Sequence, residues 1–299
     1  MSSRVAEFVE FHRFCCWNDS IVIQLKSYAD IKGLSVEQRE YLVLFYALSY
    51  SVPTAIVCLD NLDRIKRDPE GFWSENKDKL IFQSDRRWVK FNNMFARSFK
   101  DFEQKCVFRQ LRGKEKLDLE KSIGIVQKVC YFARFAAFLF LEAYCFMFGV
   151  KTFNDGIDWL KGDTATSGML NVLGFDRFAD EFDEKSILYV PPEKLSEALK
   201  TIQKMIPEQD CRSAIYVETT LCAFRKHFKG TRYAGYYVDR VLGELWQMKK
   251  FFPAFRDLDL LLDARAAVIP VRMLGEYNGW SGIRKKLCKH YIATGDWHV

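Results

Sequence analysis

Residues 130–148, CYFARFAAFLFLEAYCFMF, decide the fold, because they are apolar on almost every side at helical spacing. A helix without a polar face is buried on all sides, so the stretch predicts the central helix of a helical core. We expect it to be the second half of one long helix that begins at Lys114 or Asp118 and stops at Gly149, a residue suited to a C-terminal cap. We expect Glu142 to be paired or to lie beside a polar pocket, because an unpaired buried carboxylate is costly.

The composition is that of a folded protein with a sizeable core, since 49% of the 299 residues are apolar and 28% are charged. The 45 Lys and Arg against 39 Asp and Glu give a mild basic excess, which permits nucleic acid as a partner without requiring it. Nine Cys occur without a CxxC pair, which predicts a reducing cytosol, and the four His lack the spacing of a zinc site. The most apolar stretch, residues 135–150, is shorter than the ~20 residues of a membrane span, so we expect no membrane partner.

Two helix starts stand out before the central stretch. Ser35 followed by Gln38 predicts a capping box that begins a helix, and Pro53 predicts a bend or a new start after it. The charged residues 63–76 contain Pro69 and Gly71, which predicts a loop.

A further helix is predicted to follow Ser84, an N-cap residue. Its apolar seam repeats at three or four residues and comprises Trp88, Phe91, Phe95 and Phe99. Asp85, Arg86 and Lys90 lie off that seam. In one interpretation they are a first-turn acid and two solvated cations; in the other, the two cations hold phosphate oxygens near a helix start.

The fold class predicted is all-α, a multi-helix globular bundle. Residues 151–168 turn to Gly, Asp, Thr and Ser, which predicts a boundary between an N-terminal helical part, residues 1–150, and a C-terminal helical part, residues 151–299. We expect the two parts to pack as one globular unit with a cleft between them. Residues 169–182, MLNVLGFDRFADEF, have the outline of a helix-hairpin-helix that lacks the usual second glycine, so a DNA-glycosylase-like bundle with a degenerate motif is one version of this fold.

Residues 215–240, IYVETTLCAFRKHFKGTRYAGYYVDR, are too polar and too aromatic for a helix that only fills a core. Helical spacing predicts an inward side of Tyr216, Thr220, Ala223 and Phe224. Glu218 and Cys222 line another side, one turn apart. The segment after this helix carries side chains that can converge on one ligand: Arg232, Tyr233, Tyr236, Tyr237, Asp239 and Arg240. A charged helix end with packed tyrosines is the alternative.

Near the C-terminus, three glycines predict a loop whose backbone approaches a ligand closely. That loop would bring together Glu276, Trp280 and Arg284. The basic residues 284–290 are either a solvated helix face or a contact to a phosphate backbone.

Several enzyme classes are excluded because their motifs are absent from the sequence. There is no GxxxxGK[ST] loop for a P-loop kinase and no GxGxxG for a dinucleotide enzyme. There is also no HExxH for a zinc protease, no GxSxG for an esterase, and no HxE with PCxxC for a zinc deaminase.

Four stretches together resemble a known family: residues 33–55, GLSVEQREYLVLFYALSYSVPTA; 82–95, FQSDRRWVKFNNMF; 217–240, VETTLCAFRKHFKGTRYAGYYVDR; and 273–287, MLGEYNGWSGIRKKL. The chain is similar there to the bacteriophage enzymes of thymine hypermodification, which are the all-helical amino acid:DNA transferases and α-glutamyl/putrescinyl-thymine pyrophosphorylases. The resemblance implies that DNA bearing 5-(pyrophosphoryloxymethyl)uracil loses pyrophosphate as an amino acid's amine bonds to the 5-methylene carbon. It also implies the cytoplasm of an infected bacterial host as the location.

The residues suit that chemistry, and the roles that follow are our assignments. Cations stabilise the departing pyrophosphate, and the candidates are Arg86, Lys90, Arg232 and Arg240. A carboxylate takes the amine's proton, and the candidates are Glu218, Asp239 and Asp85. Aromatic rings hold a base outside the stack, and the candidates are Tyr233, Tyr237 and Trp280. Arg284, with Glu276 near it, is the candidate for binding the free amino acid. We expect no cofactor, and a divalent metal on the pyrophosphate is compatible although no ligand cluster demands it.

Two other functions fit the same residues. A non-catalytic helical DNA-binding module would use the cations on phosphates and the aromatic residues as core, and its DNA binding would be sensitive to salt. A DNA glycosylase-like enzyme would share the flipped base but would direct water at the sugar and release a free base.

Overall fold

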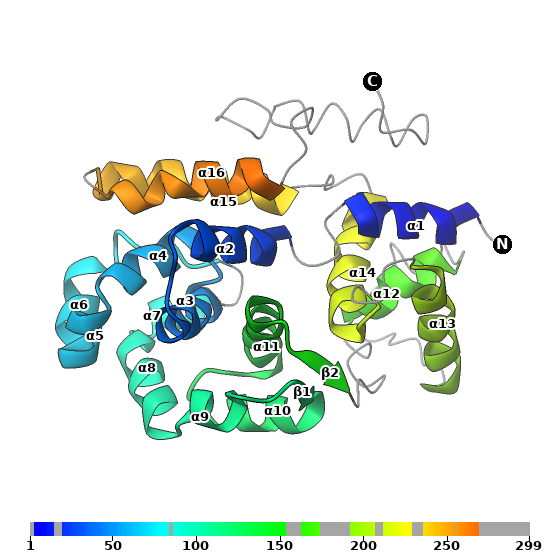
Figure 1. Cartoon of the computed structure of the whole chain (residues 1–299), viewed down its shortest axis with the longest axis horizontal. Coiled ribbons are helices and arrows are strands. Elements are labelled where there is room, and N and C mark those ends of the chain that lie inside the picture. Colours follow the sequence, from blue (N-terminus) through cyan, green and yellow to red (C-terminus); the bar gives the residue numbers. More distant parts are fainter. Residues whose placement is uncertain are drawn as a thin grey trace. The chain divides into compact units, whose positions relative to one another are not determined.

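The computed structural model describes residues 3–14, 20–83, 86–153, 163–173, 192–206, 212–228, 236–253 and 255–268. Within these residues the chain is mostly helical, with sixteen α-helices and one small two-stranded sheet (Figure 1). The predicted all-α class is therefore confirmed. In this part of the chain no helix has both the length and the apolar character that crossing a membrane requires.

Contacts divide the chain into two compact units. Unit 1 comprises Met1–Ser20, Asp155–Tyr237 and Met273–Val299, and unit 2 comprises Ile21–Asn154 and Val238–Arg272. The chain thus passes between the units several times, whereas the sequence predicts one division after residue 150. The expected cleft between the two parts stays a prediction.

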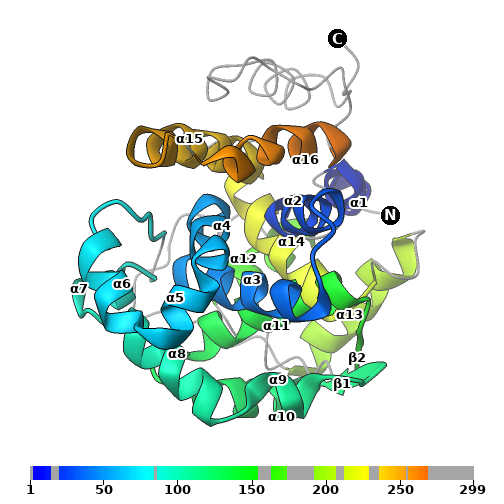
Figure 2. The same cartoon turned by 60° about the vertical axis from the view of Figure 1, so that its left-hand side comes forward.

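The described residues of unit 1 form four helices: α1 (Ser3–Phe14), α12 (Asp163–Val172), α13 (Pro192–Met205) and α14 (Ala214–Phe228). Its core includes Phe8 and Phe11 of α1, whose rings each lie 5.4 Å from the ring of Phe224 on α14. Helices α12 and α14 pack against each other (Figure 2). Gly168 permits this packing, because a Cβ atom there would lie 2.1 Å from the main-chain oxygen of Leu221.

Unit 2 holds the remaining elements, with α2 and α15 beginning at its boundary with unit 1. Its helices before the sheet are α2 (Ser20–Ile31), α3 (Val36–Ser49), α4 (Val52–Asp60), α5 (Leu62–Arg67), α6 (Pro69–Asn76), α7 (Arg87–Phe91), α8 (Phe95–Gln104) and α9 (Val107–Leu111). The later helices are α10 (Leu119–Val126), α11 (Arg134–Phe148), α15 (Tyr236–Phe251), the 3-10 helix η5 (Arg256–Leu258) and α16 (Leu260–Val268). Strands β1 (Lys116–Asp118) and β2 (Lys151–Phe153) pair in parallel.

Helix α11 is the buried central helix that the apolar stretch predicts. It packs against α3, and it ends at Gly149, whose φ of 66° is the left-handed cap conformation. The expectation of one long helix from Lys114 or Asp118 is wrong, because β1, α10 and a turn precede α11. Asp118 caps α10, and in the turn Tyr131 adopts a φ of 63°, which a continuous helix does not allow. Glu142 lies on α11 and is buried.

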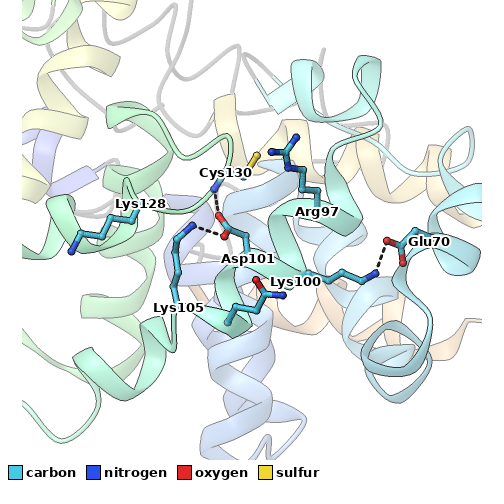
Figure 3. Close-up of a pocket in the computed structure, with 8 residues that line it drawn as sticks. Glu70, Arg97, Lys100, Asp101, Lys105, Lys128 and Cys130 are labelled. Carbon is cyan, nitrogen blue, oxygen red and sulfur yellow. Dashed lines mark hydrogen bonds and ion pairs between the residues drawn. The ribbon is translucent and has the colours of Figure 1, made fainter.

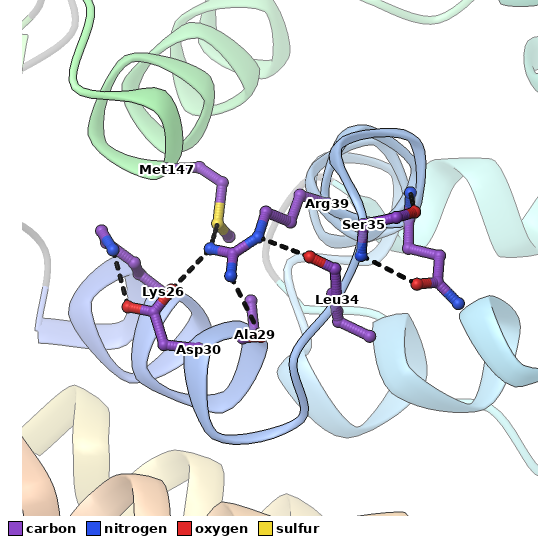
Figure 4. Close-up of polar contacts among 8 residues, drawn as sticks. Lys26, Ala29, Asp30, Leu34, Ser35, Arg39 and Met147 are labelled. Carbon is purple, nitrogen blue, oxygen red and sulfur yellow. Dashed lines mark hydrogen bonds and ion pairs between the residues drawn. The ribbon is translucent and has the colours of Figure 1, made fainter.

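The predicted capping box is present at the start of α3. Ser35 Oγ accepts a hydrogen bond from the Gln38 N–H, and Gln38 Oε1 accepts one from the Ser35 N–H (Figure 4). Arg39, one residue further, donates to the main-chain oxygen of Leu34 at 2.9 Å and pairs with Asp30 at 2.6 Å. These contacts fix the end of α2 against the start of α3.

Helices replace the loop that Pro69 and Gly71 predict for residues 63–76. Asp68 accepts a hydrogen bond from the Gly71 N–H, and Pro69 occupies the first turn of α6. Pro69 and Gly71 therefore belong to the start of a helix and not to a loop. Pro53 likewise starts α4 after the cap residue Ser51, as predicted.

The predicted apolar seam of α7 and α8 is only partly buried. Phe95 and Phe99 lie in the core, whereas Trp88 is 64% exposed and Phe91 is 71% exposed. The seam fails because α7 ends at Phe91 and Asn93 has a positive φ, so the two helices have different axes. The predicted cap residue Ser84 lies outside the described residues.

Candidate functional site

The structure describes the side chains of four predicted site residues. Glu218 lies on α14 of unit 1, and Arg86, Lys90 and Arg240 lie in unit 2. The positions outside the described residues are Asp85, Arg232, Tyr233, Glu276, Trp280 and Arg284. Tyr237 and Asp239 lie on α15, but their side chains are not among those described. The roles of all twelve residues stay predictions.

Glu218 is a carboxylate with a raised pKa. Its carboxylate accepts a hydrogen bond from the Cys222 thiol, with 3.4 Å between Sγ and Oε1, as the one-turn spacing predicts. Burial raises the pKa of Glu218 to about 7, although hydrogen bonds from Cys222 and Thr219 act in the opposite direction. A carboxylate with this pKa exchanges a proton readily at neutral pH.

The opposite side of α14 is fixed by a buried polar contact. Thr220 Oγ1 lies 2.8 Å from His12 Nδ1 and also donates to the main-chain oxygen of Tyr216. Because a hydroxyl has one hydrogen, this pattern makes His12 Nδ1 the donor to Thr220. His12 also stacks on Phe8, with 5.9 Å between the ring centres. Thr220 and Tyr216 are both buried, as the sequence predicts for the inward side of this helix. Their contacts fix the helix that carries Glu218.

Arg240 is the centre of a polar cluster in unit 2. Its Nε lies 3.1 Å from Glu244 Oε1, and its Nη2 donates to the main-chain oxygen of Tyr50 at 3.3 Å. The guanidinium carbon also lies 4.5 Å from the centre of the Tyr50 ring, an arrangement in which a cation and an aromatic face attract each other. Tyr50 itself has a φ of 54°, so this contact involves a sparsely populated backbone conformation.

Glu244 is a second buried carboxylate, which the sequence analysis missed. It is 3% exposed, and burial raises its pKa above the ordinary value for glutamate. The charge of Arg240 and the polar side chains of Ser51, Gln83 and Arg240 oppose that rise. The signal in the sequence was the spacing of four between Arg240 and Glu244, which places opposite charges on one helix face.

Arg86 and Lys90 brace turns of unit 2. Arg86 is 4% exposed and its Nη1 donates to the main-chain oxygen of Tyr131 at 2.9 Å. Its main-chain N–H donates to the oxygen of Gln83, whose side chain contacts Glu244, so Arg86 borders the Arg240 cluster. Lys90 Nζ donates to the main-chain oxygen of Leu80 at 3.2 Å. In this arrangement both cations bind protein carbonyls, so an arriving phosphate would have to displace those contacts.

Within the described residues, no three His, Cys, Asp or Glu side chains are grouped to hold a metal ion. No protein-family model matches the chain, and neither curated proteins nor solved structures yielded a match.

Proposed function

We infer that the protein is a DNA-modifying transferase that replaces pyrophosphate on 5-(pyrophosphoryloxymethyl)uracil with the amine of a free amino acid. In this reaction the amine nitrogen forms a bond to the 5-methylene carbon, and the carbon–oxygen bond to pyrophosphate breaks. The electron pair leaves with pyrophosphate, and the proton lost by the nitrogen passes to a base. The host cytoplasm is the location that belongs to this proposal.

The observation that carries the proposal is the Glu218 carboxylate on α14, which accepts a hydrogen bond from the Cys222 thiol and whose pKa burial raises to about 7. An amine attacks only when it is neutral, and general-base catalysis is most effective when the base has a pKa near the working pH. Glu218 is partly exposed as a residue, and its carboxylate lies beside Cys222 on α14. The resemblance to thymine-hypermodification enzymes supplies the substrate, and Glu218 supplies the group that the substrate's chemistry requires.

Substituting Glu218 tests the proposal. Glu218→Gln keeps the size of the side chain and removes its basicity, so pyrophosphate release from modified DNA should slow by about a factor of 10²–10⁴, the usual contribution of a general base. Glu197→Gln is the matched control, because Glu197 is an exposed glutamate on α13 of the same unit. Release at the same rate in wild type and Glu218→Gln would contradict the assignment.

Exposed aromatic and cationic side chains favour a second candidate, a DNA-binding module without catalysis. Trp88 and Phe91 are exposed and flank Lys90 on α7, and bases stack on aromatic rings in single-strand binding proteins. This candidate predicts DNA binding that weakens with salt and does not distinguish the modified base, with no release of pyrophosphate. Release of a free base would instead identify a glycosylase-like enzyme.

A further inference from the structure

Helix α8 presents a basic face that none of the proposed catalytic residues uses. Residues Arg97, Lys100, Asp101 and Gln104 recur at three or four positions, so they lie on one side of the helix. The other side carries Phe95, Phe99 and Phe102, which are buried. The polar side therefore faces away from the core of unit 2.

This face forms one wall of a pocket of about 680 Å³ (Figure 3). Four cations line it, together with two carboxylates: Arg97, Lys100, Lys105, Lys128, Glu70 and Asp101. The cations outnumber the carboxylates by two, so the pocket has a net positive charge and attracts anions.

The two carboxylates leave half of the cations unpaired. Lys100 pairs with Glu70 at 2.6 Å and Lys105 pairs with Asp101, and all four side chains are partly exposed, so solvent weakens both pairs. Within the described part of the chain, the side chains of Arg97 and Lys128 make no hydrogen bond or ion pair. Figure 3 shows them on either side of Cys130. Two cations are thus available to an incoming anion.

The pocket wall is held rigidly by two side chains of α8. Asp101 Oδ2 accepts a hydrogen bond from the Cys130 N–H at 2.6 Å, and Ser98 Oγ donates to the Cys130 main-chain oxygen at 2.9 Å. Burial acts to raise the pKa of Asp101, but hydrogen bonds from Lys105 and the Cys130 N–H, with the charges of Lys105 and Arg97, hold it below its ordinary value. Asp101 therefore stays ionised and keeps its wall in place at neutral pH, so a ligand does not have to order the pocket.

We propose that the α8 pocket is a phosphate-binding site in which Arg97 and Lys128 contact the oxyanion directly and Lys100 and Lys105 exchange their partners for it. Phosphate oxygens suit the site because Arg donates to them through two parallel N–H groups and Lys contributes a point charge. The phosphate comes either from the DNA backbone or from free pyrophosphate. The site does not depend on the proposed transfer reaction.

The test compares the double variant Arg97→Gln/Lys128→Gln with the control Lys116→Gln/Arg256→Gln. All four residues are exposed cations of unit 2, the two variants change the net charge equally, and Lys116 and Arg256 do not line the pocket. Duplex DNA and inorganic pyrophosphate are titrated separately into the full-length protein, and thermal unfolding checks that each variant folds.

The pocket variant should bind the phosphate source, which is either duplex DNA or pyrophosphate, about tenfold or more weakly than the wild type. The reason is that each hydrogen bond it loses joins two charged groups. For DNA, losing two phosphate contacts should also make the plot of log K against log salt shallower by about 1.8. A loss for DNA alone assigns the site to the backbone, and a loss for pyrophosphate alone assigns it to the free anion. Equal effects of the two double variants on both ligands, or no binding of either ligand by the wild type, would overturn the proposal.

A thiol reagent locates the ligand independently of affinity. Cys130 lines the pocket and is partly exposed, whereas Cys106, also partly exposed, lines a different one. The phosphate source should slow alkylation of Cys130 by N-ethylmaleimide, read by mass spectrometry of its peptide, and should leave Cys106 unaffected. Unchanged labelling of Cys130 with the phosphate source bound would place that ligand elsewhere and overturn the proposal.

Discussion

The packing of α12 on α14 predicts that Gly168→Ala destabilises unit 1. The added Cβ would lie 2.1 Å from the Leu221 oxygen, and real Cβ atoms essentially never approach closer than 3.0 Å, so the helices must separate by about 0.9 Å. Because the obstacle is main chain, no side-chain rotation relieves it. Overpacking of this kind costs about 3 kcal/mol, and the better helix propensity of Ala returns about 1 kcal/mol. We expect a net loss of about 2 kcal/mol in the free energy of unfolding.

Gly124→Ala is the matched control, because Gly124 lies within α10 and a Cβ there would meet nothing within 4 Å. It should stabilise the protein by about 0.5–1 kcal/mol. Urea denaturation of both variants gives the free energies, and hydrogen exchange of peptides from α12 and α14 shows whether unit 1 is the part that loosens. A Gly168→Ala variant as stable as Gly124→Ala would refute the close packing.

Three further predictions concern the cap of α3, a carboxylate pair and the proposed base. Ser35→Ala should lower the free energy of unfolding by about 1 kcal/mol, read as a shift in the urea midpoint, because it removes the capping box; no shift would show that the cap does not contribute. Burial and the hydrogen bond with Asp257 raise the pKa of Asp60 to about 7 from 3.8, so folding retains a proton that the unfolded chain loses. The stability of the wild type should therefore fall as the pH rises from about 4 to about 7 and should level off above pH 7. Thermal unfolding of Asp60→Asn should lack this part of the pH dependence. The same pH profile in wild type and Asp60→Asn would contradict this role of Asp60. The transfer rate at saturating amino acid should rise with pH through about 7, where Glu218 loses its proton, and Glu218→Gln should abolish that rise; a rise that persists in the variant would assign it to another group.

Local signals in the sequence predicted the elements whose cause is local. The capping box of Ser35 and Gln38, the restart at Pro53 and the stop at Gly149 each depend on residues within one turn of the chain, and all three are present. The break before α11 was not predictable in this way. It involves contacts between residues about thirty positions apart: Ser98 donates a hydrogen bond to the Cys130 main-chain oxygen, and Asp101 accepts one from the Cys130 N–H.

The same distinction applies to the candidate site. The spacing of Glu218 and Cys222 predicted their contact, since both lie on one helix. Glu244 was missed because its burial depends on the tertiary structure, and the polar side chains that act on its carboxylate include Ser51 and Gln83, which lie far from it in the sequence. The exposure of Trp88 and Phe91 was missed because an apolar repeat predicts burial, and only the ends of α7 and α8 show that the repeat spans two helices.

The most direct test of the proposed function is to supply an amino acid isotopically labelled at its amine nitrogen to DNA that contains 5-(pyrophosphoryloxymethyl)uracil. We expect wild-type protein to yield, after digestion to nucleosides, a thymine derivative that carries the labelled nitrogen, with one pyrophosphate released for each adduct, and we expect Glu218→Gln to yield far less. Absence of a nitrogen-bearing adduct with every amino acid tested, while the protein remains folded and the modified DNA stays intact, would contradict the proposed transfer.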